Sequence, residues 1–107
     1  MAERDIERYF RQLVANEGGI TRKWVSPGQR GVPDQVVGWP NGVTHYVELK
    51  DNNVATEQQA REHALWRSKG HWVFVIASQW EIEQYVSNYL HGKYAGSYVG
   101  DKNRNPL

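Results

Sequence analysis

Two acidic residues and a lysine stand at the ends of two short β-forming runs, where they could hold a divalent metal beside a phosphodiester. Asp34 follows Gly31 and Pro33 and opens one run, while Glu48 and Lys50 close the other. Hard cations such as Mg²⁺ take carboxylate oxygens and keep water positions that a substrate phosphate can enter. A lysine beside such a site balances phosphate charge or helps to activate the attacking water. These residue types therefore predict metal-assisted phosphodiester chemistry.

The two runs must pair as a hairpin for these side chains to meet. Residues 34–39 and 43–50 are rich in β-forming residues, and Pro40-Asn41-Gly42 separates them. Asn-Gly between two such runs is a strong hairpin signal. Gly31 and Pro33 suit the loop before the first run, because glycine permits close backbone approach and proline fixes the entry of the chain.

The length of the hairpin loop decides whether the two acids share a face. A two-residue turn would set Gln35 opposite Glu48 and put Asp34 on the wrong face of the sheet. A three-residue loop would set Asp34 directly opposite Glu48, where paired side chains lie about 5 Å apart. The metal hypothesis therefore requires the three-residue loop or a β-bulge. Pro40 favours the three-residue loop, because it cannot donate a ladder hydrogen bond.

Strand alternation assigns the faces of the second run. Glu48 and Lys50 share one face with Thr44 and Tyr46, and they should open toward a cleft. The alternate set is more apolar and should face the core; it comprises Val43, His45, Val47 and Leu49.

The other elements follow from helical periodicity, capping boxes and apolar runs. We expect helices at residues 3–16, 56–69 and 78–90, strands at 20–25 and 72–77, and a turn at 51–53. Thr56 to Gln59 and Ser78 to Glu81 have the form of capping boxes. The order helix, strand, strand, strand, helix, strand, helix predicts an α/β domain with helices on a mixed central β-sheet.

Composition excludes several classes of site. The 107 residues suit one domain, and a net charge of +1 leaves room for a local basic surface. The chain has no cysteine, which excludes disulfide scaffolds, thiolate zinc sites and cysteine nucleophiles. The four histidines show no metal-ligand spacing, so each is expected in the core or on the surface. With no long apolar run and no signal-peptide pattern, a cytoplasmic location is the default expectation.

The C-terminal stretch differs in character from the rest of the chain. Residues 1–90 carry the periodic elements, whereas residues 91–107 are polar, glycine-bearing and aperiodic. We expect a tail or an arm there. Its basic and aromatic residues alternate as in a nucleic-acid-binding arm, although a disordered polar tail explains them equally well: Lys93, Tyr94, Tyr98, Lys102 and Arg104.

The motifs together resemble those of a known family. They are Glu-Arg-Asp-Ile at 3–6, Gly-Val-Pro-Asp at 31–34, Glu-Leu-Lys at 48–50 and Gln59. This combination is similar to the VRR-NUC nucleases of the PD-(D/E)XK restriction-endonuclease-like superfamily. Residues 23–34 resemble especially the small stand-alone members found in bacteriophages. The resemblance covers roughly residues 3–90 and does not reach the tail.

The resemblance implies a restriction-endonuclease-like core and a Mg²⁺ or Mn²⁺ cofactor. The implied catalytic residues are Glu3, Asp34, Glu48, Lys50 and Gln59, with the metal held by Glu3, Asp34, Glu48 and the main-chain carbonyl of Leu49. Glu7 is the alternative to Glu3, and Gln58 is the alternative to Gln59. No organic cofactor is implied.

Stand-alone members of this family resemble Holliday-junction resolvases, which cut four-way DNA junctions as homodimers. DNA and a second copy of the chain are therefore the expected partners, with no membrane partner. Phosphate contacts are expected from basic residues flanking the site: Arg22, Lys23, Arg30 and Lys50. The alternatives are a nicking, flap or nonspecific DNase, or a catalytically silent DNA-binding module. A silent module would not need carboxylates aimed at phosphate.

Overall fold

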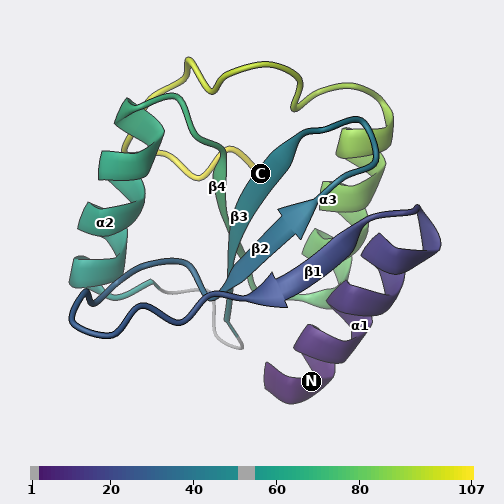
Figure 1. The fold of residues 1–107 in the computed structure, drawn as a ribbon, viewed down its shortest axis with the longest axis horizontal. Coiled ribbons are helices and arrows are strands. Elements are labelled where there is room, and N and C mark those ends of the chain that lie inside the picture. The colour runs from purple at the N-terminus through teal and green to yellow at the C-terminus, as the bar shows by residue number, and fades with distance from the viewer. Residues whose placement is uncertain (1–2, 51–54) are drawn as a thin grey trace.

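The chain folds as three helices on the two faces of a four-stranded mixed sheet, within the residues that the structure describes (Figure 1). This computed structural model describes residues 3–50 and 55–107, so the turn expected at 51–53 lies outside it. The elements are α1 (Glu3–Asn16), β1 (Ile20–Lys23), β2 (Gln35–Gly38), β3 (Thr44–Leu49), α2 (Glu57–Ser68), β4 (Val73–Ile76) and α3 (Gln79–Leu90). The predicted α/β architecture and order of elements are confirmed.

The sheet runs β1-β2-β3-β4, with β3 and β4 parallel and the other neighbours antiparallel. Helices α1 and α3 cover one face and α2 covers the other (Figure 1). No helix in the described part of the chain is long and apolar enough to cross a membrane.

The β2–β3 hairpin has the three-residue loop. The Trp39 backbone N–H donates to the Val43 carbonyl at 2.9 Å, and Gly42 closes the turn with a φ of +86°. Glycine adopts this left-handed conformation without the steric penalty of a side chain. In the resulting register Gln35 pairs with Val47, so the next residue, Asp34, comes opposite Glu48.

The predicted division of β3 into two faces is confirmed for its core side. His45, Val47 and Leu49 are buried on the face that α1 and α3 cover. The surrounding core comes mainly from α1, β2, β4 and α3: Ile6, Phe10, Val14, Val37, Phe74, Ile76, Ile82, Tyr85 and Val86. Glu48 points to the other face, where α2 buries it more deeply than an open cleft would.

Both later helices begin at the predicted caps. Thr56 Oγ1 accepts from the Gln59 backbone N–H at 3.1 Å, and Gln59 Oε1 accepts from the Thr56 N–H at 2.9 Å. Ser78 Oγ likewise accepts from the Glu81 N–H at 3.1 Å. The Glu81 carboxylate, however, accepts from the Ala77 N–H at 2.7 Å, so this second box closes one residue earlier than the sequence pattern indicates.

Residues 91–107 lie against the domain. Tyr94 and Tyr98 are buried, so their rings are not displayed on an extended arm. Near the C-terminus, the Asn105 amide donates to the Val75 carbonyl at 2.8 Å and accepts from the Val75 N–H at 3.0 Å. One side chain thus satisfies backbone groups that the edge strand β4 would otherwise leave unpaired.

Candidate active site

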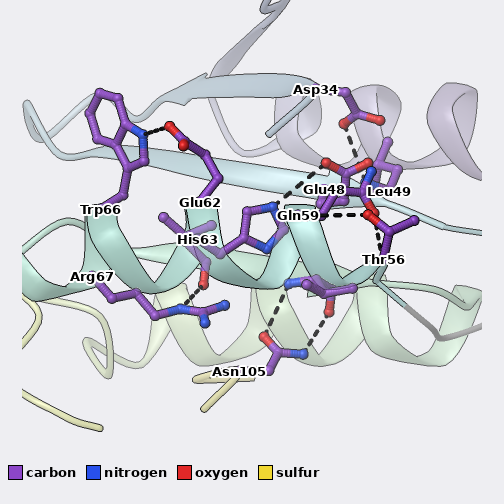
Figure 2. A network of polar contacts seen from close by, with 12 residues as sticks. Asp34, Glu48, Leu49, Thr56, Gln59, Glu62, His63, Trp66, Arg67 and Asn105 are labelled. Atoms are coloured by element: carbon purple, nitrogen blue, oxygen red, sulfur yellow. Dashed lines mark hydrogen bonds and ion pairs between the residues drawn. The ribbon is translucent and has the colours of Figure 1, made fainter. Parts of the chain in front are cut away.

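Asp34 lies just before β2, where the β1–β2 ladder ends. Its carbonyl accepts from the Trp24 backbone N–H at 2.9 Å, which fixes the backbone at this position. Its carboxylate reaches across to β3, where Oδ1 accepts from the Leu49 N–H at 3.2 Å (Figure 2). The Asp34 side chain is therefore held over the C-terminal end of β3.

Glu48 is the second carboxylate at this end of β3. It is only 4% exposed, because α2 packs over its face of the sheet. Its Oε1 atom lies 3.7 Å from His63 Nε2, and neither atom has a hydrogen-bond partner among the described residues. In Figure 2, the side chains of Asp34 and Glu48 both lie close to the Leu49 backbone. The structure thus brings together the two acids that the three-residue loop predicted to be neighbours.

Lys50 and Gln59 are the two further residues expected at this site. Lys50 is half-buried, its backbone N–H donates to the Ile76 carbonyl at 2.9 Å, and alternation puts it on the Glu48 side of the sheet. Gln59 is half-buried in the first turn of α2, beside Glu48 in Figure 2. Gln58, the alternative, is exposed.

The two candidate acids of α1 differ in what the structure describes. Glu3 is the first residue of α1, and its backbone alone is described. Glu7 lies one turn further along and is held in ion pairs, 3.4 Å from Arg11 and 3.7 Å from Lys23. Glu7 is therefore engaged with β1 and its own helix, and no described contact brings it to Asp34.

The basic residues expected to contact phosphate lie on β1 and the following loop. Arg22, Lys23 and Arg30 are exposed, as nucleic-acid contacts require. Arg22 Nη1 donates to the Thr21 carbonyl at 2.8 Å, which orients the guanidinium without neutralising it. Lys23 Nζ lies 3.7 Å from Glu7 Oε1, so the Glu7 carboxylate partly offsets the charge of the lysine.

The loop that carries Asp34 is pressed against the start of α2. Gly31 has a φ of +87°, and a Cβ atom there would lie 2.8 Å from the Gln58 carbonyl oxygen. Gln29 Nε2 also donates to Glu62 Oε1 at 3.3 Å. Loop and helix therefore frame the carboxylates together, and Gly31 serves this contact between backbones.

The residues at this site suit a hard divalent cation. Glu48 is a buried carboxylate, and an ionised carboxyl group removed from water is costly unless a cation or a donor compensates its charge. Asp34 supplies a second carboxylate, and oxygen ligands are those that Mg²⁺ and Mn²⁺ prefer. Within residues 3–50 and 55–107, no three His, Asp or Glu side chains form a ready-made metal cluster. A complete ligand set would therefore need main-chain oxygen, water or Glu3.

His63 is the residue at this site that sequence reasoning did not place there. It is 1% exposed on α2, and its ring points at Glu48 (Figure 2). The available signal was its spacing, because residues four apart share a helix face and His63 follows Gln59 by that interval. The spacing identifies a shared face but not what the face touches.

Comparison with known proteins finds close relatives. The chain is 46% identical over 78 residues to "Putative nuclease p44" of Acyrthosiphon pisum secondary endosymbiont phage 1, covering 72% of this chain and 84% of that protein. A solved structure described as "VRR_NUC domain" superposes with a TM-score of 0.76 at 34% identity, covering 81% of this chain and 96% of the other. No profile of a protein family matches the sequence.

Proposed function

Because the chain belongs to the VRR-NUC family and is a nuclease, we propose that it is a divalent-metal-dependent DNA endonuclease acting on branched DNA. The observation that carries the metal-dependent part is the pairing of Asp34 and Glu48. One carboxylate just before β2 and one on β3 meet beside the Leu49 backbone, and the carboxylate on β3 is buried. A binding module would gain nothing from negative charge placed where phosphate must approach.

Asp34 and Glu48 would hold Mg²⁺ or Mn²⁺, with the Leu49 carbonyl and Glu3 as further expected ligands. The bound cation would supply positive charge to the scissile phosphate and lower the pKa of the attacking water. The protein fixes its own carboxylates beforehand. The Leu49 N–H holds Asp34 at 3.2 Å, and burial under α2 restricts Glu48. Such preorganisation limits the reorganisation that the reaction requires.

Lys50 and Gln59 would act on the phosphate and the water. Lys50 follows Glu48 on the same face, so its ammonium can donate to a phosphate oxygen or to the attacking water and offset developing charge. Gln59 stands at the N-terminus of α2, where the helix dipole also favours an anion. Its amide orientation is fixed because Oε1 accepts from the Thr56 N–H.

DNA would approach over β1 and the loop that leads to Asp34. Arg22, Lys23 and Arg30 are exposed there and can contact backbone phosphates on either side of the cut. Such contacts position a duplex without reading its sequence. We therefore expect binding that depends steeply on salt and little on base sequence.

A four-way junction as substrate implies a homodimer. Each chain contributes one pair of site carboxylates, whereas paired cuts on opposing strands need two sites in a fixed relation. Trp80 on α3 is 65% exposed and is one side chain that such a dimer contact could cover. A symmetric dimer would place two basic surfaces along one branched substrate.

The catalytic assignment is tested by Asp34→Asn and Glu48→Gln. Both variants should lose Mg²⁺- or Mn²⁺-dependent cleavage while remaining folded and able to bind DNA, because each loses one anionic ligand. Glu17→Gln is the matched control, since Glu17 is exposed and remote from the site, and it should cleave normally. Full activity in both site variants would reject the assigned carboxylates.

The substrate assignment needs a separate comparison. Four-way junction, flap, linear duplex and single-stranded DNA would be cut with Mg²⁺ or Mn²⁺ at one salt concentration, because salt alone shifts affinity by orders of magnitude. Junctions should bind most tightly and be cut in paired positions by a dimer. A monomer in light scattering that cuts only flaps, duplex or single strands would leave the nuclease chemistry and reject the resolvase assignment.

A further inference from the structure

His63 forms an unusual buried pair with Glu48. The two residues are 1% and 4% exposed, and Nε2 and Oε1 face each other at 3.7 Å. Neither atom has a hydrogen-bond partner among the described residues. A hydrogen bond between nitrogen and oxygen is about 2.9 Å long, so the two atoms lie too far apart for one.

This arrangement is costly for a pair that only packs. Each unpaired buried polar atom costs about 1–3 kcal/mol, and two apolar side chains of similar shape would avoid that cost. The pair is explained if a cation binds the other Glu48 oxygen, Oε2, and Oε1 then accepts a hydrogen bond from His63. Closing 3.7 Å to a hydrogen bond needs only a small shift of the Glu48 side chain.

The position of His63 is fixed by the helix that carries it. Gln59, His63 and Arg67 follow at intervals of four along one face of α2. Gln59 is held in the N-terminal cap. At the other end Arg67 Nε donates to the Val73 carbonyl at 3.0 Å, and Nη1 donates to the Lys102 carbonyl at 3.2 Å. These anchors hold the imidazole against Glu48 (Figure 2).

We propose that His63 is a positioning residue for Glu48. With a proton on Nε2, the ring donates to Glu48 Oε1 and leaves Oε2 directed at the metal. The hydrogen bond thus selects one carboxylate orientation for metal binding. This inference rests on the proposed function, since it concerns the same metal. Outer partners of metal ligands typically contribute 10- to 100-fold, in order of magnitude, to metal affinity.

The test measures Mn²⁺ affinity by calorimetry on the full chain, together with the melting temperature in chelator. His63→Leu should bind Mn²⁺ roughly 10- to 100-fold more weakly. Its metal-free melting temperature should not fall, because the change removes an unpaired buried polar atom. His63→Gln should bind more tightly than His63→Leu, since an amide can still donate. His71→Leu, the same change at an exposed histidine without a contact to Glu48, should match wild type.

The Mn²⁺ dependence of cleavage separates a role in metal binding from a role in packing alone. High Mn²⁺ should restore the turnover of His63→Leu, with the KM for DNA unchanged. His63→Met is a second apolar variant and decides the question if His63→Leu does not fold. Wild-type Mn²⁺ affinity in a folded apolar variant would overturn the role of His63 and leave the proposed function intact. Failure of the wild-type protein to bind Mn²⁺ would overturn both.

Discussion

His45 should make the stability of this domain fall steeply in mild acid. The ring lies on the core face of β3, fully buried, with Nδ1 2.6 Å from the Tyr85 hydroxyl. Trp39 Nε1 donates to the same nitrogen at 3.3 Å. Burial lowers the pKa of His45 from 6.5 to about 4, with a smaller opposing contribution from the backbone of Tyr94.

The direction and size of the effect follow from this pKa. Well above pH 6.5, His45 is neutral in both the folded and the unfolded chain, so its protonation does not affect stability. Between pH 6.5 and 4 the unfolded chain binds the proton more readily, so the free energy of unfolding falls as the pH falls. The two pKa values differ by 6.5 − 4 = 2.5, which corresponds to about 3 kcal/mol at 1.36 kcal/mol per unit. A loss of that size is a large share of the stability of a small domain.

Urea unfolding of wild type and His45→Phe, at a series of pH values between about 7.5 and 4.5, isolates this contribution. Phenylalanine fills the same aromatic surroundings but cannot take up a proton. The variant should be less stable at neutral pH, because the Tyr85 hydroxyl loses its hydrogen-bond partner at His45 Nδ1. The difference from wild type should then shrink by up to about 3 kcal/mol as the pH falls. If the stabilities of wild type and His45→Phe fall in parallel with pH, at equal dependence on urea, the effect does not come from His45.

Two further predictions concern the frame and the chemistry of the site. Gly31→Ala should cost more than about 3 kcal/mol in urea unfolding, because a positive φ and a carbonyl 2.8 Å from the new Cβ both oppose it. Gly28→Ala, with a φ of +85° and open space around it, should cost only about 1–2 kcal/mol, and equal costs would contradict the clash. Lys50→Ala should lower turnover roughly 10²-fold while Mn²⁺ affinity in calorimetry is retained, because an ammonium is not a ligand. Loss of Mn²⁺ affinity would indicate a structural role instead.

The sequence by itself determined the order of the elements and the faces of β3. Thr56 and Gln59 predict their own cap, because the contacts of a capping box lie within one helical turn. The alternation of Val47 and Glu48 likewise predicts which side of β3 faces the core. These signals are local, so a short stretch of sequence contains both partners of each contact.

The hairpin loop marks the limit of such signals. The sequence allowed a two-residue or a three-residue turn, and only the latter brings Asp34 opposite Glu48. The structure has the three-residue loop, with Gly42 in the left-handed conformation and Trp39 hydrogen-bonded to Val43.

The roles of Glu3, Lys50 and Gln59 in catalysis stay predictions.

Tertiary structure alone decided the contacts between distant segments. His63 meets Glu48 because α2 packs across β3 at one particular position and rotation, and no spacing within either element specifies that placement. Tyr94 and Tyr98 are buried for the same reason, although their surroundings in the sequence resemble a polar tail. Helix periodicity fixes which residues share a face, whereas the surface that covers this face depends on how all the elements pack around one core.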